Sequence, residues 1–305
     1  MARSPSPLPA PLAAQPFSVA DSDAHAVPRG RLRARDLTQP FRAVRVSASL
    51  LAATKDERKF RLLCEAFTTK MPARWFFSSA TAARILGVPV PRRLEQFELH
   101  VSSLTPHERP RGRRIRGHSA PRATIRLFEG LPVRDPAELW CELASVLSVD
   151  ELIQAGDRML SENPFRLATM QQLAAAVLRH GRRPGARKLR EALPQLRERV
   201  WSPKETTVRL TIIRAGMPEP ENNKPIYDRS GRLVAIGDLV LERFMTLVEY
   251  EGERWHADAR AVIDVDRFNA LSALRWTIVR VRKHHSRADI ERLVARALRA
   301  NGWRP

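Results

Sequence analysis

Residues 232–251 read RLVAIGDLVLERFMTLVEYE, two apolar runs separated by a short polar break. Apolar residues that recur at a period of two are typical of β-strands. The stretch therefore predicts two strands, 232–240 and 244–251, joined by a tight turn as an antiparallel hairpin. Helical spacing around the hairpin predicts helices at 202–215, 257–274 and 288–300 and a further strand at 276–281. This order of elements predicts a small mixed α/β domain.

Carboxylates occupy unexpected positions in this hairpin. Glu249 and Glu251 alternate onto one face with Leu247, and Asp238 shares its face with Ile236. An isolated buried carboxylate costs on the order of several kcal/mol or becomes protonated, and a bound cation offsets that cost. Mg²⁺ takes oxygen ligands and is commonly held by one or two carboxylates. The pattern indicates a Mg²⁺ or Mn²⁺ site, and the alternative is that these acids are solvated or paired with arginine.

Two further side chains have competing interpretations. Glu205 follows Ser202 at the spacing of a capping box, in which the glutamate satisfies the backbone amide of the serine. Capping the helix and binding a metal are therefore competing uses of one side chain. His256 comes just before a predicted helix, and it is either a proton shuttle or an exposed loop residue.

The length of 305 residues is about twice the roughly 150 residues of one domain, so we expect more than one folded unit. Prolines are concentrated in residues 1–45, which we interpret as a disordered extension. Residues 46–134 carry helical patterns at 55–69 and 78–87 and strand patterns at 96–102 and 124–128. Asp135-Pro136 begins a helical connector over 135–201, and the mixed-sheet domain covers 202–305. The predicted class is α/β of the α+β type.

The formal net charge of +20 concentrates polyanions near the surface, so nucleic acid is the expected partner. Residues 202–305 carry 19 basic and 14 acidic side chains, whereas residues 1–201 carry 34 and 19, so we expect the first half to dock DNA. A loop or ribbon that contacts phosphates is predicted at Arg109, Arg111, Arg113, Arg114 and Arg116, with a solvated loop as the alternative. RNA stays open as a partner, although no aromatic ladder for stacking bases is present.

Cysteine content and hydropathy exclude several other classes of protein. Cys64 and Cys141 are too few for a disulfide framework or a four-cysteine zinc site. No apolar run approaches the ~18 residues that cross a bilayer, and prolines interrupt any signal-peptide core. We therefore expect a soluble cytoplasmic protein with no membrane partner.

Residues 202–302 resemble the very-short-patch-repair-like branch of the PD-(D/E)XK restriction-endonuclease superfamily. The motifs that carry this resemblance are Ser202-Pro203-Lys204-Glu205-Thr206, Gly237-Asp238-Leu239, Val248-Glu249-Tyr250-Glu251-Gly252 with His256, Asp264-x-x-Arg267-x-x-x-Leu271 and Trp276-x-x-x-Arg280. The first half is similar to the winged-helix and α/β region of abortive-infection-type antitoxins. That second resemblance depends on residues 79–87, 113–118 and 131–136.

The first resemblance implies a restriction-endonuclease-like domain that hydrolyses phosphodiester bonds of DNA with Mg²⁺ or Mn²⁺, in defence or repair. Asp238 and Glu249 would be the metal-binding acids, and Glu205 the supporting acid. Members of this branch usually have aspartate where Glu251 stands, and the core lysine of other nucleases is absent. His256 or Glu251 would then help to deprotonate the attacking water.

Two alternatives remain at this stage. Arg280 would contact the scissile phosphate, or it pairs with Asp264 or Glu249. The whole chain is either an endonuclease or a DNA-binding, antitoxin-like regulator, whose nuclease-like domain has lost catalysis and serves as a scaffold or homodimerisation unit. The departure at Glu251 and the concentration of positive charge before residue 202 motivate the second interpretation.

Overall fold

Three β-sheets and twelve α-helices are found in the described part of the chain, which comprises residues 5–95, 98–251 and 258–305 of a computed structural model. The protein is therefore of the α+β class, as the sequence predicted. It separates into two units, Met1–Glu142 and Leu143–Pro305, so the boundary falls inside the predicted helical connector 135–201. None of the helices among these residues combines the length and the apolar character needed to cross a membrane.

A small antiparallel sheet begins unit 1. Its strands lie in the order β1 (Phe17–Ser18), β3 (Val44–Ser47) and β2 (Leu37–Thr38), and it is accompanied by α1 (Ala10–Ala13) and α2 (Val19–Ala24). Four side chains from this segment bury one another in a small core: Leu12, Phe17, Val27 and Leu32. The sequence predicted disorder over residues 1–45, whereas the described residues of this segment fold, because apolar side chains lie between the prolines at positions that can meet.

A five-stranded mixed sheet forms the rest of unit 1. It follows α3 (Ala48–Ala53) and α4 (Asp56–Thr68), and its strands lie in the order β6 (Ile115–Ser119), β5 (Leu99–Ser103), β4 (Trp75–Phe77), β8 (Leu131–Arg134) and β7 (Ile125–Phe128). Helix α5 (Ser79–Ile85) follows β4, and α6 (Pro136–Leu143) follows β8. The helices predicted at 55–69 and 78–87 and the strands predicted at 96–102 and 124–128 are confirmed within the described residues.

Unit 2 begins with three helices that the sequence had assigned to a connector: α7 (Val149–Leu160), α8 (Met170–His180) and α9 (Ala186–Ala192). Helix α10 (Pro203–Arg214) follows them, where the sequence predicted the first helix of the mixed-sheet domain. Helix α7 begins at a reciprocal capping box between Ser148 and Glu151, which satisfies two of the backbone amides that a helix leaves unpaired at its start. Because α7 packs against α10, these helices belong to the same unit as the sheet that follows.

The third sheet contains the hairpin from which the fold was predicted. Its strands lie in the order β12 (Thr277–Arg282), β11 (Thr246–Glu251), β10 (Leu233–Leu241) and β9 (Glu221–Tyr227), and only β11 and β12 pair in parallel. Helix α11 (Asp258–Ala273) connects β11 to β12, and α12 (Arg287–Ala300) ends the fold. Every element predicted between 202 and 300 is confirmed, but β9 was not predicted, since its sequence ENNKPIY lacks apolar alternation.

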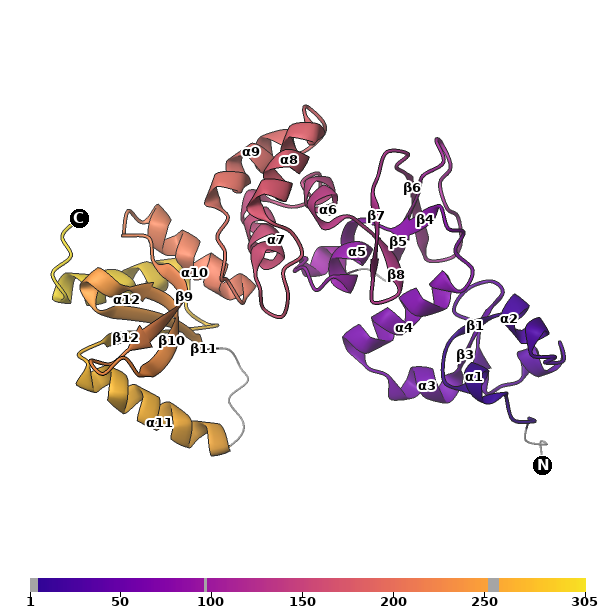
Figure 1. Cartoon of the computed structure of the whole chain (residues 1–305), viewed down its shortest axis with the longest axis horizontal. Coiled ribbons are helices and arrows are strands. Elements are labelled where there is room, and N and C mark those ends of the chain that lie inside the picture. Colours follow the sequence, from indigo (N-terminus) through magenta and orange to yellow (C-terminus); the bar gives the residue numbers. More distant parts are fainter. Residues whose placement is uncertain (1–4, 96–97, 252–257) are drawn as a thin grey trace. The chain divides into compact units, whose positions relative to one another are not determined.

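Helices cover both faces of this sheet (Figure 1): α10 and α12 lie on one side and α11 on the other. Leu239 and Val248 are buried in the core that contains residues of α10 and α12. Their strand neighbours Val240 and Leu247 are buried with Leu271 of α11. Since side chains alternate along a strand, any acid inside β10 or β11 lies beneath a helix and loses water.

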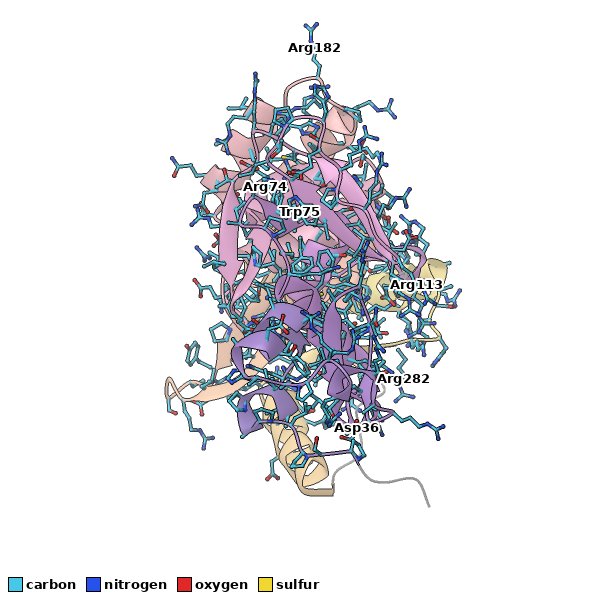
Figure 2. The ribbon with its side chains drawn as sticks, turned by 90° about the vertical axis from the view of Figure 1, so that its right-hand side faces the viewer. Asp36, Arg74, Trp75, Arg113, Arg182 and Arg282 are labelled. Atoms are coloured by element: carbon cyan, nitrogen blue, oxygen red, sulfur yellow. The ribbon has the colours of Figure 1, made fainter. Side chains whose placement is uncertain are left out.

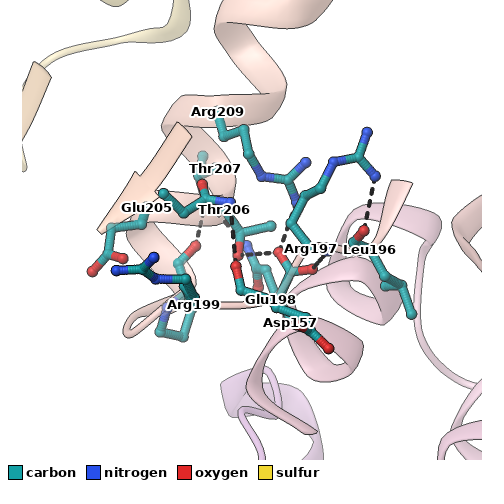
Figure 3. A network of polar contacts seen from close by, with 12 residues as sticks. Asp157, Leu196, Arg197, Glu198, Arg199, Glu205, Thr206, Thr207 and Arg209 are labelled. Atoms are coloured by element: carbon teal, nitrogen blue, oxygen red, sulfur yellow. Dashed lines mark hydrogen bonds and ion pairs between the residues drawn. The ribbon is translucent and has the colours of Figure 1, made fainter. Parts of the chain in front are cut away.

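A buried ion pair joins α7 to α10 (Figure 3). Asp157 Oδ2 accepts hydrogen bonds from Arg209 Nη2 at 2.7 Å and from the Thr206 hydroxyl at 2.8 Å, and Oδ1 accepts from the Arg197 backbone N–H at 2.7 Å. The side chains of Asp157 and Arg209 are 0% and 1% exposed. Removal of one partner would leave the other charge buried without compensation.

We expect Asp157→Ala to lower the free energy of unfolding of unit 2 by about 3–5 kcal/mol, because Arg209 would lose the one fully buried carboxylate partner that it has among the described residues. Urea denaturation followed by circular dichroism measures this change. The matched control is Glu162→Ala, which breaks an ion pair between Glu162, 76% exposed, and Arg166, and should cost less than about 1 kcal/mol. Equal effects of the two substitutions would contradict the assigned role of the pair.

Candidate active site

Asp238 and Glu249 lie side by side on neighbouring strands. The antiparallel register pairs Leu239 of β10 with Val248 of β11, which places the two acids next to each other. The backbone N–H of Tyr250 donates to Asp238 Oδ2 at 2.9 Å. Burial raises the pKa of both carboxyl groups, and the charge of Asp238 further raises the pKa of Glu249. Both acids are therefore partly buried on the face of the sheet that α11 covers.

Glu205 approaches the same acids from the start of α10. Glu205 is 6% exposed. Burial raises the pKa of its carboxyl group, and the negative charge of Asp238 raises that pKa further. The charge of Asp238 thus acts on both Glu205 and Glu249.

The capping interpretation of Glu205 is correct only in part. Ser202 Oγ accepts a hydrogen bond from the Glu205 backbone N–H at 3.2 Å, so Ser202 is the N-cap of α10. The carboxylate of Glu205 accepts from the backbone N–H of Trp201 at 2.9 Å and from Asn223 Nδ2 at 2.7 Å. The acid therefore joins the start of α10 to strand β9.

Arg267 of α11 is the cation that faces the two strand acids. It forms an ion pair with Glu249 Oε1, and the same Nη2 donates to the carbonyl oxygen of Ile236 at 3.1 Å. The guanidinium lowers the pKa of both Asp238 and Glu249, against the larger effect of burial. Carboxylate and carbonyl oxygens are also the ligands of hard divalent cations, so Arg267 contacts the same kinds of atoms that a metal would.

Glu251 lies farther along β11 and has its own partners. Arg280 Nε lies 3.2 Å from Glu251 Oε1, and Arg282 Nε lies 2.9 Å from Oε2. The Arg280 guanidinium also lies 5.5 Å from the ring centroid of Phe268. Arg280 pairs within the protein in this structure, with Glu251 as its partner, and the side chain of Asp264 lies outside the described part of the chain. His256 lies outside the described residues.

The predicted phosphate-contacting arginines are in unit 1. Arg109, Arg111, Arg113 and Arg114 precede β6, and Arg116 lies within that strand. All five are exposed, and Arg113 lies at the outer edge of the ribbon in Figure 2. The loop folds tightly onto β6 at Gly117, where a Cβ atom would lie 1.9 Å from the carbonyl oxygen of Pro110. Only glycine allows this approach.

A divalent metal would find suitable atoms here but no assembled set of ligands. Within the described ranges, no group of three His, Cys, Asp or Glu side chains is arranged to hold a metal ion. The available donors are nevertheless oxygens of the kind that Mg²⁺ prefers, in one buried carboxylate, Glu205, and two partly buried ones, Asp238 and Glu249. Asn223 Oδ1 adds an amide oxygen that is buried with no hydrogen-bond partner among the described residues. The donor chemistry therefore fits Mg²⁺, and binding would require Glu249 to exchange Arg267 for the metal.

Sequence reasoning did not identify Asn223, and it gave Arg267 no role. Asn223 is fully buried on β9, where its amide group donates to both Glu205 and the carbonyl oxygen of Arg199. The only sequence signal for it was a pair of asparagines in a strand that lacks alternation.

Two uncharacterized proteins of Mycobacterium tuberculosis, from two strains, are similar to this chain. Each is 31% identical over 183 residues, which cover 60% of this chain and 66% of the relative. The match thus spans slightly less than two thirds of the length of these relatives. No protein-family model matches the sequence. No solved structure matches it either.

We expect Asp238→Asn to stabilise unit 2 at neutral pH. Burial raises the pKa of Asp238 in the folded state above 3.8. The protonated carboxyl group therefore contributes its full stability below pH 3.8. That stability is lost as pH rises through the folded-state pKa, because the buried group ionises. Asparagine removes the charge, and its Oδ1 can still accept from Tyr250. Thermal unfolding with a chelator present should give a higher Tm than the native chain at neutral pH and no difference below pH 3.8.

Asp228→Asn is the contrasting variant, because its effect should have the opposite sign. Hydrogen bonds from the Ser230 hydroxyl and the Arg232 backbone lower the pKa of Asp228 to about 2. The ionised carboxylate therefore stabilises the fold above its unfolded-state pKa, and this stabilisation is lost as pH falls through the folded-state pKa. Its removal should lower Tm at neutral pH. A lower Tm for Asp238→Asn as well would show that the charge of Asp238 is not a cost to the metal-free fold.

Proposed function

We propose that unit 2 is a metal-dependent endonuclease domain that hydrolyses phosphodiester bonds of DNA, with a role in defence or repair. One observation carries this proposal: three carboxylates with raised pKa values, from α10, β10 and β11, are electrostatically coupled inside a strongly basic protein. Groups with perturbed pKa values that cluster in this way are typical of active sites. The restriction-endonuclease-like resemblance of residues 202–302 supports the same reaction.

Each residue would have a distinct role in this reaction. Asp238 and Glu249 would hold Mg²⁺ or Mn²⁺, with Glu205 supporting them. When bound, the ion would neutralise charge on the phosphate and lower the pKa of a water molecule. His256 or Glu251 would accept the proton of that water. Arg280, now paired with Glu251, would turn to the scissile phosphate.

Unit 1 would supply affinity for the DNA backbone. In this proposal it is a winged-helix, antitoxin-like unit, and the exposed arginines of residues 109–116 contact phosphates. Binding of this kind releases counterions, so it weakens as salt concentration rises.

The second candidate is a DNA-binding, antitoxin-like regulator with an inactive nuclease-like domain that acts as a scaffold or in a homodimer. A specific observation favours it: the acids already have partners inside the protein, Arg267 for Glu249 and Arg280 with Arg282 for Glu251. Both candidates place DNA on unit 1, with RNA as an alternative ligand. They differ in whether the acids of unit 2 release their partners for a metal.

Nicking of supercoiled plasmid separates these candidates. We expect Mg²⁺- or Mn²⁺-dependent nicking that chelator abolishes and that Asp238→Asn or Glu249→Gln each reduces more than about 100-fold, because a ligand is lost rather than a supporting group. Gel-shift binding should persist in both variants. Glu291→Gln, at an exposed acid of the same unit, is the matched control and should nick like the native chain.

The outcome assigns the function directly. A DNA gel shift without metal-dependent nicking would support the regulator and remove the endonuclease. Residual nicking of equal extent in Asp238→Asn, Glu249→Gln and Glu291→Gln would show that these acids do not hold the metal. Replacing the plasmid with a structured RNA tests the remaining partner.

We further expect Arg267→Met to increase the response to metal, because it removes the cation that pairs with Glu249. Without metal, this variant should unfold at a lower temperature than the native chain, since the charges of Asp238 and Glu249 would be uncompensated. Added Mn²⁺ should raise its Tm by more than that of the native chain. The control for loss of positive charge is Arg229→Met, at an exposed arginine between strands β9 and β10. Equal Mn²⁺-induced shifts in all three proteins would show that Arg267 does not compete with a metal.

A further inference from the structure

Unit 1 contains a cavity of about 1150 Å³ at the beginning of helix α4. It is lined by the loop at residues 38–41, the first turns of α4, Arg84 of α5, and Arg113 and Arg114 just before β6. Small-molecule sites in proteins usually measure about 300–1,000 Å³. The cavity therefore has room for a ligand larger than a simple anion.

The cavity wall is predominantly cationic. Six basic and three acidic side chains line it, and one of the acids, Glu57, is already paired with Arg84 at 2.9 Å. Four of the basic side chains form no ion pair with a carboxylate anywhere in the described part of the chain: Lys55, Lys59, Arg92 and Arg113. Lysine and arginine gathered around one space favour an anion with more than one negative charge, and phosphate groups suit both side chains.

One wall of the cavity is apolar and is held in place. Phe41, Phe60 and Leu63 line it, and the Arg84 guanidinium lies 3.7 Å from the centroid of the Phe60 ring. Arg84 is only 16% exposed, and its Nε is buried without a hydrogen-bond partner among the described residues. An apolar wall beside a cationic one suits a ligand that carries a flat, weakly polar body next to its phosphates.

The backbone around the cavity is also unusual. Asp56 and Arg114, which both line it, have φ angles of 43° and 61°. Residues other than glycine adopt this region at a cost of about 1–3 kcal/mol, and such strain is frequent at ligand-binding sites.

We propose that this cavity binds a phosphorylated ligand of the nucleotide class. Lys55, Lys59, Arg92 and Arg113 contact the phosphates, and the base lies against the apolar wall. A free nucleotide and the 5′-phosphorylated end of a DNA strand share this chemistry. The proposal is independent of nuclease activity, because every residue in it belongs to unit 1.

Isothermal titration calorimetry of the full chain tests this site with four probes: ATP, adenosine, and a pentanucleotide with or without a 5′-phosphate. We expect ATP, the 5′-phosphorylated pentanucleotide or both to bind at least about tenfold more tightly than the corresponding unphosphorylated probe. Tight binding of ATP alone identifies a free nucleotide as the ligand. Dependence on the 5′-phosphate alone identifies the end of a strand.

Charge-reversal variants locate the binding. Lys59→Glu and Arg113→Glu should each weaken it at least about tenfold, whereas Arg122→Glu, at an exposed arginine of unit 1 that does not line the cavity, should leave it within about twofold. Lys59→Gln and Arg113→Gln serve as milder variants if circular dichroism shows that a reversal disturbs folding. No preference for phosphate in either pair of probes would overturn the proposal. Equal weakening by Arg122→Glu would also overturn it, since the attraction would then be diffuse.

Discussion

Desolvation of carboxylates is the constraint on which the C-terminal sheet depends. Because helices cover both faces, an acid placed inside β10 or β11 has little water to stabilise its charge. Asp238 and Glu249 nevertheless lie there, and both have raised pKa values. An apolar side chain in either place would make a simpler and more stable core. Acids that a fold retains at such a cost are typical of a chemical site, and Arg267 partly compensates their charge in this structure.

The position of Glu205 depends on residues that precede the segment 202–305. Asp157 of α7 binds Thr206 and Arg209 of α10, and so it fixes the helix at the turn that carries Glu205. Residues 202–305 alone would lack the carboxylate that pairs with Arg209. Helix α7 is therefore part of the structural support of the candidate site, although it precedes residue 202.

Arginine has different roles in the two units. In unit 2, Arg267 and Arg280 are paired with acids of the candidate site, so their charges are already engaged. In unit 1, the arginines of residues 109–116 are exposed, and Arg113 also reaches a cavity whose cations outnumber its acids. Lys55, Lys59, Arg92 and Arg113 form no ion pair with a carboxylate among the described residues, so their charge is available to an outside anion, which agrees with the proposed division between DNA binding and chemistry.

The amino-acid sequence by itself determined three helices and three strands after residue 202, because helical and strand periodicity are local properties of the chain. It did not reveal the fold of residues 5–45, strand β9 or the partners of the acids. Those features depend on contacts between distant segments, such as Arg267 with Glu249 and Asn223 with Glu205. Only the tertiary structure decided which cation reaches each carboxylate, since a side chain's partner is set by packing rather than by sequence spacing.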